Sequence, residues 1–340
     1  MPRNLGSPLQ RWNYSQGWTA EGIPTRGIVG TQTVSVWIWA NHGVGKSQPR
    51  ICVAVGPHYV RRHKPMTSVL VLDKSYLDGA PTTAVRELCT QHKVLCCETL
   101  FYELMTTKPR SQIRCFSKLP EGPGSFALLP NVGALLRFEM EHRRPCGPIE
   151  NHVLDGTYIF NEKLRTGTYL PPPEVQKTLD EWQAQVNDDA KSFLERCQSV
   201  HHFFPELIGI EFRNFPAAVA AAKTRISSNP EEVRRVFSTF ERDSLPPGAP
   251  HAAEIDAEWA WYRWVQCQVF AALRMFERYQ CHVPAAPTPK VLERAEHSMH
   301  DLEYVLIGSL AGALASNDDE VMEDFYLARP EGKLVTSRAQ

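Results

Sequence analysis

The sequence predicts an α/β fold in which a parallel sheet lies between two layers of helices and carries a large, mostly helical insertion. Three observations support this prediction. Residues 66–107 alternate between strand-like and helix-like patterns, as expected of a parallel sheet. Residues 174–279 hold four helical patterns in succession. Residues 290–340 return to alternating helices and strands, so the two alternating segments are expected to share one sheet.

The first half of the predicted core covers residues 66–120. Ser68–Leu72 is a short, apolar run rich in β-branched residues, which is typical of a strand buried in a parallel sheet. Asp73–Gly79 follows as a turn. A helix, a strand and a second helix come next, and Thr99 is the expected cap of the second helix. These three elements are Thr82–His92, Lys93–Cys97 and Thr99–Thr107.

The predicted insertion covers residues 121–289. It begins with a stretch rich in proline and glycine that includes one helical pattern, Val132–His142, and a break follows at residues 171–173. Four further helices are expected at Glu174–Ser199, Phe215–Ser227, Pro230–Arg242 and Ala252–Tyr279. The last of these is rich in aromatic residues, which we expect to pack in a core; a surface that stacks on bases is the alternative.

The second half of the predicted core covers residues 290–340. Two helices are expected first, and Asp301 would stand at the start of the second. A short strand, a turn with a further helix, and a final strand complete this half. The expected helices are Lys290–His300 and Leu302–Gly312, the expected strands are Ala313–Ala315 and Lys333–Thr336, and the turn begins at Asn317.

Residues 1–65 differ from the rest in charge. They contain eight lysines and arginines and one acid, in a chain whose net charge is −1. This break predicts a poorly structured or spurious extension that ends before Met66, and a basic arm for nucleic acid is the alternative. The segment Ala40–Ser47 fits a loose phosphate-loop pattern. Because a β-branched run follows it where a helix is required, we interpret the match as chance.

Composition restricts the class of protein further. No run of about 18 apolar residues is present, so we expect no membrane span. The N-terminus lacks the pattern of a secretory signal. Nine cysteines without a C-x-x-C pair are typical of reduced thiols, so we expect a cytoplasmic protein rather than a disulfide framework or zinc site.

Four acidic residues are expected at one edge of the sheet. Asp73 and Asp318 each follow a predicted strand, and Glu103 and Asp301 lie on predicted helices that begin at the same edge. Carboxylates gathered in this way repel one another unless a cation neutralises them. Hard divalent ions with oxygen ligands, Mg²⁺ or Mn²⁺, do so, and two such ions form a clamp that cleaves phosphodiesters.

The order of these elements resembles that of the PIN-like nucleases. Asp73 is followed two residues later by Ser75, and Glu103 lies on the second helix of the core. Asp301 lies on a late helix, and Ser316 precedes Asp318 where the family usually has threonine. The resemblance covers residues 66–120 and roughly 290–335. It implies a metal-dependent endonuclease, with RNA favoured over DNA, in which the four acids hold Mg²⁺ or Mn²⁺.

The same resemblance suggests supporting roles. Ser75, Ser316 and Asp319 are expected to hydrogen-bond to the acids. Asp319 is also a rival ligand to Asp318, and Glu303 is a rival to Asp301 that would face another direction. Phosphate contacts are expected from four cations: Lys74, Lys108, Arg110 and Arg114. Each assignment has a simpler alternative, which is a turn or helix cap for the acids and a solvated loop for the cations.

Two other functions compete with the nuclease. A non-catalytic PIN-like scaffold would bind a partner or inhibitor protein through the helical insertion. An aspartyl-phosphate phosphatase would also place an aspartate after its first strand, but it needs a second aspartate at position 75, which is Ser75 here.

Overall fold

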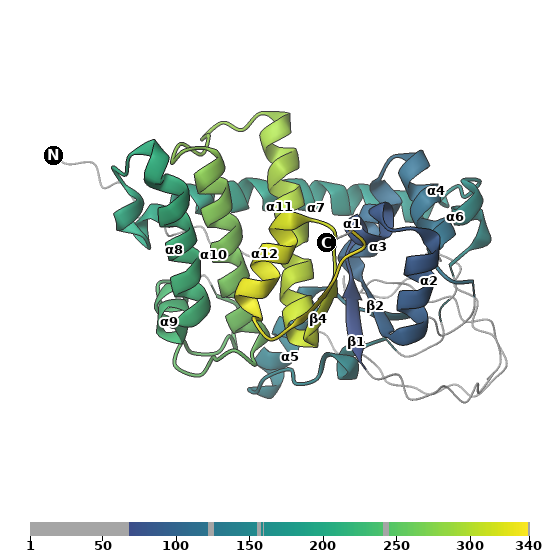
Figure 1. The fold of residues 1–340 in the computed structure, drawn as a ribbon, viewed down its shortest axis with the longest axis horizontal. Helices are drawn as coiled ribbons and strands as arrows, with labels where there is room; N and C mark the ends of the chain where they lie inside the picture. The colour runs from purple at the N-terminus through teal and green to yellow at the C-terminus, as the bar shows by residue number, and fades with distance from the viewer. Residues whose placement is uncertain (1–67, 122–125, 155–157, 159, 241–244, 339–340) are drawn as a thin grey trace.

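The computed structural model describes residues 68–121, 126–154, 158, 160–240 and 245–338 (Figure 1). The predicted extension 1–65, with its segment Ala40–Ser47, lies outside the described residues. The described residues contain a parallel sheet of five strands in the order β3-β2-β1-β4-β5. The strands are β1 Val69–Leu72, β2 Lys93–Cys97, β3 Phe126–Leu129, β4 Ala313–Ala315 and β5 Lys333–Val335. The prediction of a parallel α/β sheet is therefore confirmed.

The central strand β1 joins the two halves of the chain. Leu72 of β1 is paired in register with Ala315 of β4, and Val69 is paired with Lys93 of β2. Leu70, Val71 and Leu72 are fully buried, which explains why this strand is an unbroken apolar run. One strand was not expected: β3 lies within residues 121–289, so the sheet takes a strand from the range assigned to the insertion. Its sequence, Phe-Ala-Leu-Leu, contains no β-branched residue, which removes the usual strand signal.

Six helices accompany the first three strands. They are α1 Lys74–Gly79, α2 Thr82–Gln91, α3 Glu98–Thr106, α4 Pro109–Lys118, α5 Val132–His142 and α6 Glu162–Thr166. The predicted turn after β1 is wrong, because Asp73 accepts the Ser75 N–H and starts α1. The predicted cap of α3 is also wrong. Cys97 is the N-cap, and Thr99 lies inside the helix, where its hydroxyl donates to Glu303.

The helices of the insertion surround α10. They are α7 Pro173–Gln198, α8 Phe215–Ser228, α9 Pro230–Ser238 and α10 Ala260–Arg278. Every residue from Ala260 to Phe276 is buried, so the expected core packing of its aromatic side chains is confirmed. The predicted start at Ala252 is wrong. The carboxylate of Glu139 accepts the N–H groups of Ala260 and Trp261, at 2.7 and 3.0 Å, and so fixes where α10 begins.

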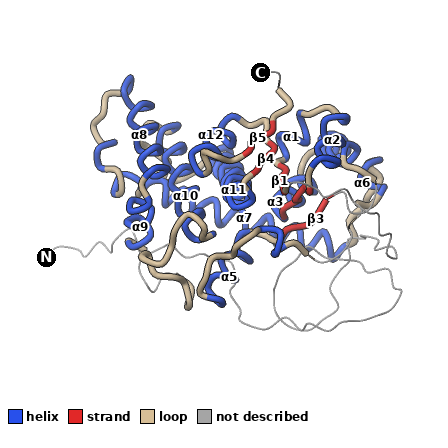
Figure 2. Tube along the Cα trace, turned by 60° about the horizontal axis from the view of Figure 1, so that its bottom comes forward, coloured by secondary structure: helices blue, strands red, loops and turns tan. Residues whose placement is uncertain are grey.

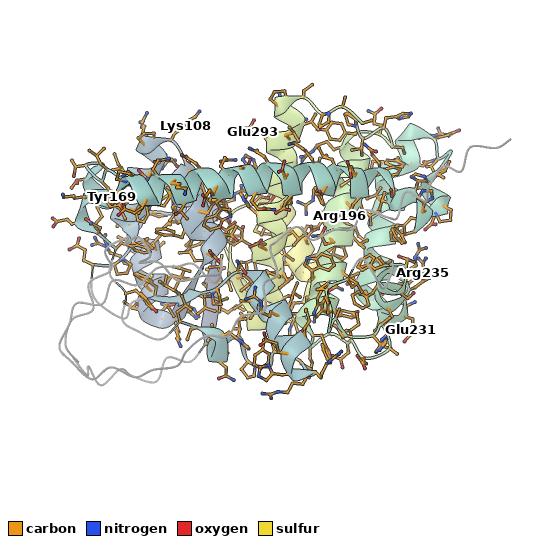
Figure 3. The ribbon with its side chains drawn as sticks, turned by 180° about the vertical axis from the view of Figure 1, so that it is seen from behind. Lys108, Tyr169, Arg196, Glu231, Arg235 and Glu293 are labelled. Carbon is orange, nitrogen blue, oxygen red and sulfur yellow. The ribbon has the colours of Figure 1, made fainter. Side chains whose placement is uncertain are left out.

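One long helix links the insertion to the sheet. Helix α11 spans Pro289–Ala311 without a break, so the two separate helices predicted around Asp301 are wrong. It packs against β1 and β4 and also against α7, α10 and α12, which spans Asp319–Ala328. In Figure 2 the strands lie between α11 and α12 on one side and α1 and α2 on the other, consistent with three layers. Figure 3 shows α7 crossing the opposite face of the molecule.

Two further properties follow from the described residues. None of their helices is both long and apolar enough to cross a membrane. Their eight cysteines are all free thiols, and seven of these are buried.

Candidate active site

The four predicted acids line one pocket at the carboxyl edge of the sheet. Asp73 follows β1, Glu103 lies on α3, Asp301 on α11, and Asp318 between β4 and α12. The pocket has a volume of about 360 Å³. Its other lining residues are Lys74, Ser75, Asp78, Arg278, Arg294, His297, Ser298 and Glu320. Asp73 and Asp318, which are 245 positions apart in the chain, therefore share one cavity.

Asp73 is the most tightly held of the four acids. Its Oδ1 accepts the Ser75 N–H at 3.1 Å, and its Oδ2 accepts the hydroxyls of Ser75 and Ser316. The hydroxyl of Ser316 in turn accepts the N–H of Asp318 at 3.0 Å. Burial and the nearby charge of Glu103 raise the pKa of Asp73 to about 6, although the two hydroxyls lower it. The expected supporting roles of Ser75 and Ser316 thus have the required hydrogen bonds.

Glu103 lines the same pocket as Asp73 and has a defined orientation. Its Oε2 accepts the hydroxyl of Tyr304 at 2.7 Å, and its Oε1 lies 3.4 Å from the ammonium of Lys74. Nδ1 of the buried His300 is 3.8 Å from the same Oε1. Burial lowers the pKa of His300 and favours its neutral form, although Glu103 opposes this shift. Lys74 is therefore the cation that directly compensates Glu103.

Asp301 reaches the pocket from the middle of α11 and not from a helix start. Burial raises its pKa well above the usual value, and the nearby carboxylates of Asp318, Asp73 and Glu103 add to this effect. Among the described residues, Asp301 has no hydrogen-bond or ion-pair partner. Asp318 caps α12, because its Oδ1 accepts the N–H groups of Glu320 and Val321 at 2.8 and 3.2 Å. Its second carboxylate oxygen has no such hydrogen bond among the described residues.

The donor set fits a hard divalent cation. The pocket presents carboxylate and hydroxyl oxygens, the ligand types that Mg²⁺ and Mn²⁺ prefer. Six acidic side chains and three lysines or arginines line the pocket, so it holds more negative charge than its own cations neutralise. Within the part of the chain that the structure describes, no three acidic, histidine or cysteine side chains already converge closely enough to hold an ion. Binding of a metal ion would therefore require the carboxylates to move closer to one another.

Other predicted residues lie outside the pocket. Asp319 is exposed and pairs with Arg338 at 2.6 Å. It does not line the pocket, so no contact supports its expected role as a hydrogen-bond partner of the acids or as a rival ligand. Arg114 pairs with Asp78, which lines the pocket, but does not line it itself. The exposed Lys108 and Arg110 belong to the start of α4. Of the four cations predicted to contact phosphate, only Lys74 lines the pocket. Glu303, as expected, faces elsewhere and accepts a hydrogen bond from Thr99.

Six pocket residues were not predicted from the sequence: Asp78 in α1, Arg278 at the end of α10, Arg294, His297 and Ser298 on α11, and Glu320 in α12. The signal for two of them was present. Arg294, His297 and Asp301 follow the spacing i, i+3, i+7, which places them on one helical face. Dividing α11 at Asp301 concealed this face. Nothing in the sequence indicates that the end of α10 lies beside this edge of the sheet.

No protein-family model matches the chain, and no curated protein or solved structure matches it significantly. The comparisons therefore show no family for this chain. Its resemblance to the PIN-like nucleases stays a prediction from the sequence.

Proposed function

We propose that the chain is a metal-dependent endonuclease with a PIN-like core, acting on phosphodiester bonds, with RNA favoured over DNA. One observation supports this proposal above all others. Asp73, Glu103, Asp301 and Asp318 come from four separate elements and line one pocket at the edge where parallel sheets place their sites. Four carboxylates in one cavity are costly to the apo protein, so a role that uses their charge explains them best.

The residues of the pocket have different roles in the proposed metal site. Asp73, Glu103, Asp301 and Asp318 would hold Mg²⁺ or Mn²⁺, which supplies Lewis acidity toward a phosphate and lowers the pKa of a water. The hydroxyls of Ser75 and Ser316 keep Asp73 in one orientation. Lys74 and Tyr304 hold Glu103, so that its carboxylate faces the cavity without rotating freely.

Cleavage of defined oligonucleotides tests the proposal. The purified full chain is incubated with single-stranded and hairpin RNA, and in parallel with DNA, in Mn²⁺, in Mg²⁺ and in chelator. We expect cuts only with metal, and we expect Asp73→Asn to abolish them. Asp319→Asn is the matched control, because it neutralises an exposed acid outside the pocket.

Two results would overturn the nuclease. One is cleavage that persists in chelator or in Asp73→Asn. The other is folded protein that cuts neither RNA nor DNA in any metal, which would favour the non-catalytic scaffold.

We also propose a cytoplasmic location, because the buried thiols are unpaired in the described residues.

A further inference from the structure

The cations that line the acidic pocket differ in whether their charge is already used. Lys74 is paired with Glu103 at 3.4 Å, and Arg278 is paired with Glu320 at 2.5 Å. Arg294 has neither an ion pair nor a hydrogen bond to any described residue. An arginine in a pocket with four nearby carboxylates would be expected to pair with one of them. The guanidinium of Arg294 is therefore available to a ligand that enters the pocket.

The position of Arg294 on α11 relates it to the acids. It precedes Asp301 by seven residues, two turns of helix or about 10 Å along the axis. His297 and Ser298 lie between them and also line the pocket. One helical face thus presents a cation, an imidazole, a hydroxyl and a carboxylate in a row.

The groove next to the pocket offers no comparable cation. It shares Arg278 and Glu320 with the pocket, and it is also lined by Lys223 and Arg274. Lys223 pairs with Glu323, and Arg274 pairs with Glu320. Their charges are already matched within the protein. An anionic strand that extends away from the acids would therefore be attracted along the α11 face rather than into this groove.

We propose that Arg294, with His297 beside it, binds a phosphate of the substrate strand near the phosphate that is hydrolysed. This proposal rests on the proposed nuclease function. The guanidinium suits the role because its planar set of donors matches two phosphate oxygens at once. The contact fixes the register of the strand without reading a base. The α11 helix would then hold both a ligand of the cation and the anchor of the neighbouring strand.

Binding at several salt concentrations tests this contact. Asp73→Asn protein is titrated into a fluorescently labelled single-stranded RNA, and anisotropy is followed from 50 to about 200 mM salt. We expect Arg294→Ala to reduce the slope of log affinity against log salt by about 0.7, the value for one phosphate contact on a single strand. Arg294→Lys should keep most of the slope. Lys290→Ala is the matched control, because Lys290 is an exposed cation on the same helix and does not line the pocket.

Steady-state cleavage by otherwise native protein supplies a second readout. We expect Arg294→Ala to raise KM about tenfold with little change in kcat, because a remote phosphate is held equally in the ground and transition states. Suppose that Asp73→Asn protein binds RNA and native protein cuts it, but that adding Arg294→Ala changes neither the salt slope nor KM. The proposed Arg294 contact is then wrong and the nuclease stands. If Asp73→Asn protein does not bind RNA and native protein does not cut it, the proposed nuclease function itself is wrong.

Discussion

Ser316 donates a hydrogen bond of 2.5 Å to Oδ2 of Asp73 across 243 residues of sequence. The bond joins the ends of two neighbouring strands, β1 and β4, at the edge where the pocket opens. The same hydroxyl accepts the N–H of Asp318. One buried serine therefore sets the positions of two candidate ligands, from the two halves of the core, relative to each other.

Loss of this hydroxyl is expected to weaken cation binding. Ser316→Ala removes a donor to Asp73 and an acceptor for Asp318, and partners of this kind are worth about 10- to 100-fold in metal affinity. Isothermal titration with Mn²⁺ measures the effect. Ser309→Ala is the control, because the buried Ser309 hydroxyl bonds only to a backbone oxygen of its own helix. Equal affinities in the two variants would contradict the role given to Ser316.

Replacing Asp301 is expected to stabilise the apo protein. Its pKa is raised, so ionising it destabilises the folded state increasingly as the pH rises above the value for the unfolded chain. Each unit of raised pKa corresponds to about 1.4 kcal/mol. In thermal melts at pH 8, Asp301→Asn should unfold at a higher temperature than the parent in chelator, but Mn²⁺ should no longer stabilise it.

The surface acid Asp319 provides the comparison for Asp301. Asp319→Asn loses only an exposed pair with Arg338, so its stability should change by no more than about 0.5 kcal/mol and its response to Mn²⁺ should persist. If Asp301→Asn behaves like Asp319→Asn in both measurements, the ionised carboxylate of Asp301 does not destabilise the folded protein as described above.

Cation affinity should depend on pH through Asp73. The pKa of Asp73 is raised to about 6, and protons compete with the cation for its oxygens. Mn²⁺ affinity should therefore rise steeply with pH below about 6 and more gradually above it. Ser316→Ala should move this midpoint to higher pH, since the Ser316 hydrogen bond lowers the pKa of Asp73. A midpoint near pH 4 in the parent would show that the burial of Asp73 has little effect.

A second buried acid, Glu98, should make stability depend on pH without affecting the site. Burial raises its pKa to about 8, with the nearby Glu303 adding to the shift, while its Oε2 accepts the Asn131 N–H at 3.1 Å. The folded state therefore binds more protons, and stability falls as the pH rises from about 4.5 toward 8. Glu98→Gln keeps an acceptor for Asn131 and removes the charge. Its melting temperature should exceed that of the parent by more at pH 8 than at pH 5.

The ion pairs between the insertion and α12 should contribute to the stability of the fold rather than to metal binding. Asp324 is buried and is held by Arg274 and by Lys223, which lies 3.3 Å away. Asp324→Asn leaves two buried cations with less compensation, at a cost of about 3–5 kcal/mol in urea unfolding. Glu323→Gln removes the half-exposed partner of Lys223 and should cost at most about 1 kcal/mol. Comparable losses in both variants would contradict this ranking.

Sequence patterns predicted the sheet and its acids well where the signal was local. The strands Lys93–Cys97 and Ala313–Ala315 and the helix Val132–His142 have the predicted bounds, because each combines the right period with a clear break at its ends. All four candidate acids line one pocket. Asp73 and Asp318 follow strand ends, as predicted, whereas Asp301 reaches the pocket from the middle of α11 and not from the predicted helix start.

The errors arose where tertiary contacts decide the outcome. Helix α10 begins where the distant carboxylate of Glu139 caps it, and no pattern near Ala260 shows this. The division of α11 at Asp301 treated an aspartate as a cap, although the surrounding helix is continuous. The pocket cation Arg278 was missed because its position depends on how the insertion packs against the sheet. Arg294 was missed because the predicted division of α11 separated it from Asp301.

The pairing of β1 with β4 also determines when the pocket can exist during synthesis. A ribosome makes roughly 5–20 residues per second, so the 243 residues between Ser316 and Asp73 take about 10 to 50 s to emerge. For most of that interval Asp73 and Glu103 are present without Asp301 and Asp318. Contacts of such long sequence separation also form late in folding. The nascent chain therefore carries only two of the four candidate metal ligands until residue 301 has been made.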